Sequence, residues 1–326
     1  MTEPKIELHV HLEGAIRPPS LLRIARRNDI PLPVDTVEDL NRLYEFRDFR
    51  HFIEVWVMTT NCLRTAEDFR QVVVDYAAEA ASHGAVYLEA IFSPAERMLR
   101  GIKGEELFTG YAEGATEAYE RHGVTVRFTP DLYRTMPDLE LAEQVARLCV
   151  AYADRGVVGL GVGGIEAGNR LAPFARCFDV VRDAGLGVVP HAGEAAGPDS
   201  IREALDLGAD RLRHGIRAVE DPALLAELAA RDVVLDVCPT SNLRTRVVAS
   251  LDAHPLPALR AAGVSCSIST DDPAMFDTDL DREYALAARL GVTAREAYAA
   301  GVAGALCDQV TRDRLAEIAA NTAWAT

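Results

Sequence analysis

The chain has 326 residues, 49% of them hydrophobic, and carries a formal net charge of −16. This size and apolar content predict one large domain with a sizeable core, and the acidic balance argues against nucleic acid as a partner because phosphate would be repelled. The sequence shows no signal peptide and no run of about 18 apolar residues, and its six cysteines are scattered without a CxxC spacing, so we expect a reduced, cytoplasmic protein that does not enter a membrane.

Short apolar, β-branched runs recur along the chain. They predict eight strands, at residues 6–11, 86–92, 124–129, 157–162, 186–191, 211–214, 233–238 and 264–270. Segments rich in Ala, Leu, Glu and Arg lie between them with helical spacing, for example 66–81, 139–154, 173–184 and 221–230. Eight strands that alternate with helices predict an α/β fold, a (β/α)8 TIM-type barrel in which residues 1–326 form a single domain.

The segment between the first two predicted strands is far longer than one crossover requires. It contains two additional predicted helices, at residues 21–27 and 48–58. The excess, about residues 29–65, predicts a helical insertion at the barrel rim beside the end of the first strand. Such an insertion serves either as a lid or pocket wall or as a purely structural addition, and the sequence leaves both interpretations open.

Polar side chains follow the predicted strands at the points where these strands end. His9 and His11 share one face of the first strand because side chains alternate along a strand. The later strand ends carry His191, Glu194, His214, Asp271 and Asp272. Barrel enzymes place their chemistry at the carboxyl ends of strands, so we expect these side chains to converge. Three histidines and an aspartate would bind a divalent metal and leave a position for water.

Each of these residues also has a structural interpretation. Glu194 could be an acid at a helix N-terminus, His214 a buried barrel histidine and Asp272 a helix cap. Cys238 is interpreted as a small buried residue, since no neighbouring base is evident to activate it. The remaining histidines lie in helical or loop contexts and are assigned no role; they are His51, His83, His122 and His254.

The motifs as a set resemble the adenosine deaminase family of the amidohydrolase superfamily. The resemblance runs over nearly the whole chain and is carried by residues 5–15, 86–94, 191–194, 213–215, 238–242 and 269–273. It implies a hydrolytic deaminase that removes the 6-amino group of a purine as ammonia. It also implies one zinc ion (Zn2+), with the ligands His9, His11, His191 and Asp271.

The resemblance implies further roles, residue by residue. Glu194 would give a proton to the purine N1, and His214 would orient the zinc-bound water and take its proton. Asp272 would hydrogen-bond to N7, and the backbone at Gly164 would meet N3. The implied substrate contacts are His11, Glu13, Gly164 and Asp272.

Substrate choice depends mainly on Glu13. The family's nucleoside deaminases usually carry an aspartate here that meets the 5′-hydroxyl, whereas glutamate is common in relatives that act on free adenine. Gly161 and Gly163 also depart from the usual aspartate and alanine before Gly164. In contrast, residues 270–278 look more like the nucleoside branch.

We therefore expect a small-molecule 6-aminopurine nucleoside as substrate, either adenosine or a 5′-modified adenosine such as aminodeoxyfutalosine. Free adenine is the alternative. Another metal-dependent amidohydrolase activity and a non-catalytic binding barrel are more remote alternatives. An oligomer is possible, although no sequence feature specifies one.

Overall fold

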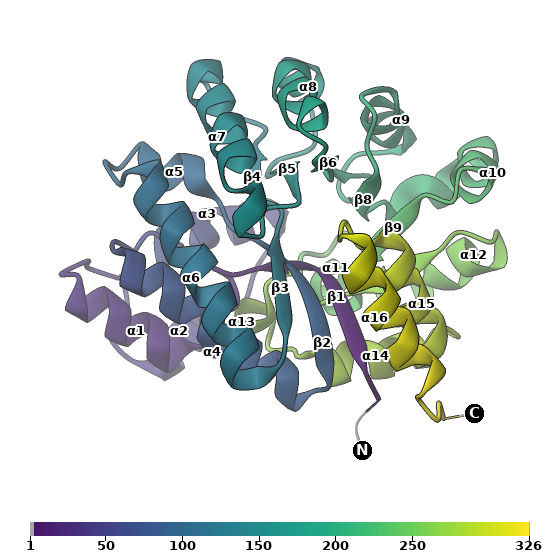
Figure 1. The fold of residues 1–326 in the computed structure, drawn as a ribbon, viewed down its shortest axis with the longest axis horizontal. Helices are drawn as coiled ribbons and strands as arrows, with labels where there is room; N and C mark the ends of the chain where they lie inside the picture. The colour runs from purple at the N-terminus through teal and green to yellow at the C-terminus, as the bar shows by residue number, and fades with distance from the viewer. Residues whose placement is uncertain (1–2, 326) are drawn as a thin grey trace.

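The computed structural model describes residues 3–325, in which strands and helices alternate along the chain (Figure 1). The strands are β1 (Lys5–His11), β2 (Ala85–Ile91), β3 (Thr125–Phe128), β4 (Asp131–Tyr133), β5 (Gly159–Gly163), β6 (Gly187–Val188), β7 (His191–Ala192), β8 (Arg211–His214), β9 (Val234–Val237) and β10 (Cys266–Ile268). Each predicted strand is present, with its ends shifted by a few residues.

The helices cover the outside of the strands. They are α1 (Pro18–Arg27), α2 (Val37–Leu43), α3 (Phe49–Thr60), α4 (Ala66–Ser82), α5 (Pro94–Met98), α6 (Gly104–His122), α7 (Leu139–Ala151), α8 (Ala175–Asp183), α9 (Pro198–Asp206), α10 (Pro222–Ala230), α11 (Pro239–Arg244), α12 (Leu256–Ala261), α13 (Pro273–Phe276), α14 (Leu280–Arg289), α15 (Ala294–Gly304) and α16 (Gln309–Ala320). Four 3-10 turns complete the set: η1 (Ala153–Arg155), η2 (Ala172–Phe174), η3 (Ile216–Glu220) and η4 (Leu251–Ala253). The helices predicted at 139–154 and 173–184 are therefore each divided between an α-helix and a 3-10 turn.

The strands pair in parallel in three groups, β1–β2–β3, β4–β5–β6 and β7–β8–β9–β10. Pro190 interrupts the strand predicted at 186–191, and Pro130 lies between the strand predicted at 124–129 and β4, which was not predicted. Proline has no backbone N–H and removes one ladder hydrogen bond. The carbonyls of both prolines still accept hydrogen bonds from the neighbouring strands, from Gly161 at 2.8 Å and from Arg213 at 3.0 Å.

Hydrogen bonds also join these groups. Phe128 and Val157 form a parallel bridge between the β3 and β5 segments, and Val10 and Asp271 form another between the first strand and the last. At this second joint, His11 N donates to Asp271 O at 2.7 Å and Asp271 N donates to His9 O at 3.0 Å. The order of neighbours is thus that of an eight-stranded (β/α)8 arrangement, and the predicted α/β class is confirmed.

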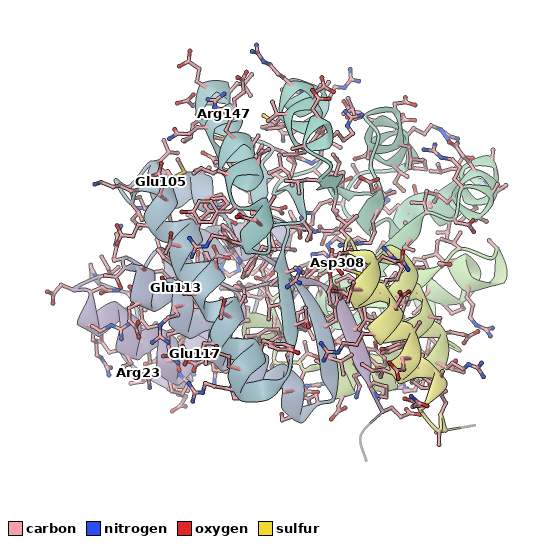
Figure 2. All side chains as sticks on the ribbon, in the orientation of Figure 1. Arg23, Glu105, Glu113, Glu117, Arg147 and Asp308 are labelled. Atoms are coloured by element: carbon pink, nitrogen blue, oxygen red, sulfur yellow. The ribbon has the colours of Figure 1, made fainter. Side chains whose placement is uncertain are left out.

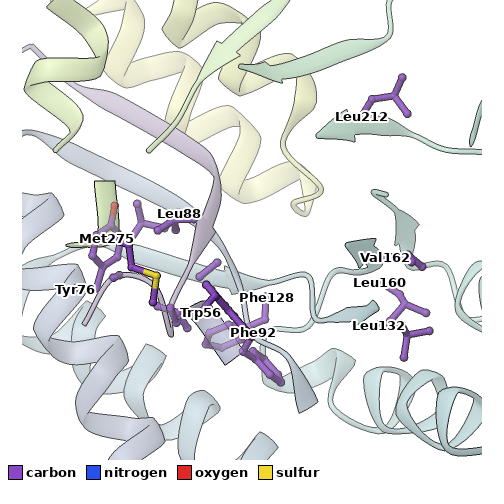
Figure 3. Close-up of a cluster of buried hydrophobic side chains, with 14 of the residues drawn as sticks. Trp56, Tyr76, Leu88, Phe92, Phe128, Leu132, Leu160, Val162, Leu212 and Met275 are labelled. Carbon is purple, nitrogen blue, oxygen red and sulfur yellow. The ribbon is translucent and has the colours of Figure 1, made fainter. Parts of the chain in front are cut away.

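The main hydrophobic core lies between the strands and the surrounding helices (Figure 3). Phe92 and Phe128 meet there edge to face, with ring centres 5.6 Å apart. A second cluster forms where α15 and α16 pack beside β1 (Figure 1). Gly301 permits this close approach, because a Cβ at that position would lie 2.7 Å from the Cβ of Ile6.

Charged side chains project from the outer faces of the helices, as Figure 2 shows for Glu105, Glu113 and Arg147. Among residues 3–325, no helix is both long enough and apolar enough to cross a membrane. The predicted insertion contains α2 and α3. Helix α3 begins where the Asp48 side chain accepts a hydrogen bond from His51 N at 2.8 Å, which is N-capping.

Candidate active site

A cavity of about 540 Å³ opens at the carboxyl ends of the strands. Six of the predicted site residues line it together with Gly164: His11, His191, Glu194, His214, Asp271 and Asp272. Helix α3 contributes one wall through Phe49, Phe52, Ile53, Trp56 and Val57. The insertion therefore forms a pocket wall, and lid motion stays a prediction.

The four predicted metal ligands converge beside this cavity. His11 Nε2 lies 3.3 Å from His191 Nε2, and Asp271 Oδ1 lies 3.4 Å from the Nε2 atoms of both His9 and His11. Ligands at about 2.0–2.1 Å from a zinc-sized ion at tetrahedral corners would lie about 3.3–3.4 Å apart. The spacing of these side chains therefore fits one divalent metal.

The electrostatics of the histidines agree with this interpretation. Burial lowers the pKa of His11 to about 4 and lowers the pKa of His9 and His191 well below the ordinary value. Neutral imidazoles present lone pairs, and those of His11 and His191 face each other across 3.3 Å. His9 Nε2 is buried with no hydrogen-bond partner. A cation between these atoms would satisfy all of them.

The outer nitrogens of two ligands are held by neighbouring groups. His9 Nδ1 lies 3.6 Å from Cys238 Sγ, and His191 Nδ1 lies 3.2 Å from the carbonyl oxygen of Val162. Such contacts fix which nitrogen faces a metal. Burial raises the pKa of Cys238 well above the usual thiol value, in keeping with a small buried residue rather than a nucleophile.

Asp131 at the start of β4 is a site residue that the sequence did not reveal. Its Oδ2 lies 3.3 Å from His191 Nδ1, and its Oδ1 is paired with the Arg213 guanidinium. It also lines the cavity, where burial raises its pKa to about 6.

Glu194 follows β7 and His214 ends β8, and both side chains face the proposed metal position. His214 Nε2 lies 3.6 Å from Glu194 Oε2 and 3.7 Å from Asp271 Oδ2. Burial, followed by the negative charges of Asp271 and Glu166, raises the pKa of Glu194 well above its ordinary value. Glu194 precedes α9, which begins at Pro198, so the helix-terminus interpretation does not hold.

The loop that carries Glu194 is held by a second carboxylate. Glu166 accepts hydrogen bonds from the backbone N–H groups of Gly193, Glu194, Ala195 and Ala196, at 2.5, 3.0, 2.7 and 2.8 Å. Glu166 is buried, with 3% of its surface exposed. Its role could not be found in the sequence, because its four partners lie about thirty positions away along the chain.

Asp272 is held by the insertion. Trp56 Nε1 donates to Asp272 Oδ1 at 2.8 Å, and burial, followed by the charge of Asp271, raises the pKa of Asp272. Gly14 packs so closely that a Cβ there would lie 1.6 Å from the same oxygen. Asp272 precedes α13 without a side-chain capping bond, so the helix-cap interpretation does not hold.

Glu13 is the one predicted substrate contact that does not line the cavity. Its side chain is buried, accepts a hydrogen bond from Ser93 N at 2.8 Å and lies 3.6 Å from Arg97 Nη2. It is not among the residues that line the cavity. Glu13 thus packs behind the cavity wall at Ser93. This geometry does not favour direct contact between Glu13 and a substrate.

Comparison with known proteins complements this geometry. The family model described as adenosine deaminase matches residues 4–321. The aminodeoxyfutalosine deaminase of Acidothermus cellulolyticus is 54% identical over 331 residues, which cover 99% of this chain and 93% of that protein. The adenine deaminase of Sphingopyxis alaskensis is 35% identical, covering 86% and 82%. The crystal structure of adenine deaminase from Arthrobacter aurescens superposes with a TM-score of 0.92 at 31% identity, covering 97% and 98%.

Proposed function

We propose that this chain, which belongs to the adenosine deaminase family, acts with zinc on a 5′-modified adenosine. The first candidate substrate is aminodeoxyfutalosine. The chain is a hydrolytic deaminase of the amidohydrolase type. The convergence of His9, His11, His191 and Asp271 beside the cavity is the observation that carries the zinc proposal. The 54% identity to an aminodeoxyfutalosine deaminase over the whole chain carries the substrate proposal.

The reaction follows from the arrangement of the side chains. Zinc, when bound, lowers the pKa of a coordinated water to about 7, so a hydroxide nucleophile is available at neutral pH. Glu194, whose raised pKa favours the protonated form, donates to N1 of the purine as C6 is attacked. His214, whose Nε2 lies 3.6 Å from Glu194 Oε2, would face the attacking water. The C6–amine bond then breaks as the proton of the new C6 hydroxyl passes to the amine, and ammonia and the 6-oxo purine leave.

Two further groups hold the base. Asp272 hydrogen-bonds to N7, with its other contacts fixed by Trp56 and Gly14. Gly164 has a φ of +86° and lines the cavity with backbone alone, which allows a ring to approach its N–H toward N3. Both assignments agree with the family resemblance.

The shape of the cavity favours a nucleoside over a free base. Beyond the catalytic groups, the cavity continues along the apolar side chains of α3 to Leu99 and Arg100. A free adenine would leave this outer part unfilled, whereas a 5′ substituent would bury it. Adenine remains the alternative substrate, because relatives with that activity are 35–37% identical.

A spectrophotometric panel tests the proposal. The compounds are adenine, adenosine, 5′-deoxyadenosine, methylthioadenosine and aminodeoxyfutalosine, and we expect the highest kcat/KM for the last. Adenine as the best substrate would overturn the nucleoside assignment. If the zinc-loaded protein removes the 6-amino group from none of these compounds, another amidohydrolase reaction is favoured.

A further inference from the structure

A line of hydrogen bonds runs from His214 away from the cavity to the start of α12. His214 Nδ1 lies 3.3 Å from Asn242 Nδ2, and Asn242 Oδ1 lies 3.2 Å from His254 Nε2. At the far end, Leu256 N donates to His254 Nδ1 at 3.1 Å. The side chains of Asn242 and His254 are buried, and both lie outside the cavity lining.

The backbone N–H of Leu256 determines the direction of every bond in this line. It can only donate, so His254 Nδ1 must be the acceptor and a neutral His254 carries its proton on Nε2. That proton requires the oxygen of Asn242, which turns the amide N–H₂ toward His214. A flipped amide would leave two donors facing each other, the Asn242 amide and the N–H at His254 Nε2. Burial lowers the pKa of His254 to about 4, which agrees with a neutral ring.

We infer that Asn242 and His254 are positioning residues that hold neutral His214 in the tautomer with its proton on Nε2. The inner edge of His214 then presents an N–H, and its Nδ1 lone pair is occupied by the amide of Asn242. The 3.6 and 3.7 Å separations of His214 Nε2 from the Glu194 and Asp271 carboxylates are consistent with an N–H that points between them.

This inference rests on the proposed function for its mechanistic consequence. A His214 that carries its proton on Nε2 orients the attacking water as a hydrogen-bond donor. It cannot take the water's proton at Nε2, since that nitrogen has no free lone pair. The general-base role that the resemblance implies for His214 is therefore replaced by a donor role. The water's proton passes instead to the Glu194 carboxylate, where it replaces the proton that Glu194 gives to N1.

Nitrogen NMR of the metal-loaded protein labelled with ¹⁵N-histidine tests the tautomer without any substrate. The His214 signals are identified by their loss in His214→Gln. We expect the proton on Nε2 and a bare Nδ1; a proton on Nδ1 would overturn the inference. In Asn242→Asp, the side chain can only accept toward His214, so a proton should appear on Nδ1. An unchanged His214 pattern in this variant would remove Asn242 from its positioning role.

Kinetics provides an independent measurement. His254→Leu should lower kcat by about 10- to 100-fold, by analogy with the loss of an outer hydrogen-bond partner of a metal-binding histidine, while KM and bound metal stay near their normal values. The matched control is His122→Gln at the end of α6, which lies outside the cavity lining and should leave kcat unchanged. Normal kcat in a folded His254→Leu would show that His254 has no positioning role. If the wild-type protein deaminates no purine, the proposed function fails while the NMR result still stands or falls by itself.

Discussion

Glu194 is deeply buried and lines the cavity in which we propose that the purine binds. Replacement by glutamine keeps the shape of the side chain but removes the acidic proton. We expect Glu194→Gln to lower kcat by roughly two to four orders of magnitude, the usual contribution of a general acid. Metal content, measured by atomic emission, should be unchanged because Glu194 is not a proposed ligand. Near-normal turnover would remove Glu194 from the mechanism.

Asp271 supplies the only proposed oxygen ligand. Ser241 Oγ donates to its Oδ2 at 2.6 Å, which leaves Oδ1 facing His9 and His11. Asp271→Ala should therefore reduce bound zinc after gel filtration, and activity should fall in parallel. Full zinc retention in this variant would contradict the ligand assignment, whatever happens to the activity.

Glu166 holds the backbone of the loop that carries Glu194. In Glu166→Gln, the amide N–H₂ would face backbone N–H groups that now donate to a carboxylate, and an unsatisfied buried donor costs about 1–3 kcal/mol. We expect both a lower Tm and a lower kcat, measured by calorimetry and by the deaminase assay. Glu203→Gln is the control, because Glu203 also accepts two backbone N–H groups, at 3.2 and 3.1 Å, but outside the cavity. A loss of Tm with unchanged kcat in Glu166→Gln would make its role purely structural.

The sequence predicted those residues whose position follows from strand periodicity. His9 and His11 are separated by one pleat, and His191 and Asp271 follow other strands, so their convergence requires only the barrel arrangement. Trp56, Glu166 and Asn242 could not be recognised in this way. Each acts through a partner in a different element, and their local sequence contains no periodic signal.

At the scale of elements, α3 decides how the outer cavity is lined. Ile53 and Val57 lie on its cavity side and are only partly buried. Ile53→Ala should lower kcat/KM for aminodeoxyfutalosine by roughly tenfold, the scale of losing a few methylene contacts. Adenosine is the internal comparison, and its kcat/KM should change much less because it lacks the extended 5′ group. Equal losses for both compounds would show that α3 does not contact the 5′ substituent.

The sequence predicted the existence of the elements better than their continuity. The run at 186–191 has the composition of one strand, but Pro190 divides it into β6 and β7. This division is a consequence of one missing N–H. In the insertion, the length between the first two strands predicted extra helices, whereas their contact with the cavity depends on tertiary packing around Trp56.

At the scale of the whole molecule, the proposed metal would be linked to the stability of the entire barrel. Its ligands come from β1, β7 and the end of β10, so an ion that binds only the folded state stabilises all of them together. At free zinc a thousandfold above Kd, this linkage amounts to about 4 kcal/mol. We expect chelation to lower Tm and added zinc to restore it, as followed by calorimetry. Identical melting with and without chelator would contradict a resident metal.

The hydrogen-bonded joint between Val10 and Asp271 also determines the order of events when the protein is made. His9 and His11 emerge from the ribosome early, but their fourth partner lies more than two hundred and fifty positions later. Closing so long a segment is slow, and it must wait for nearly the whole chain. A nascent chain therefore has two exposed histidines and no complete site. Capture of the ion would mark the end of folding, and only finished molecules would become active.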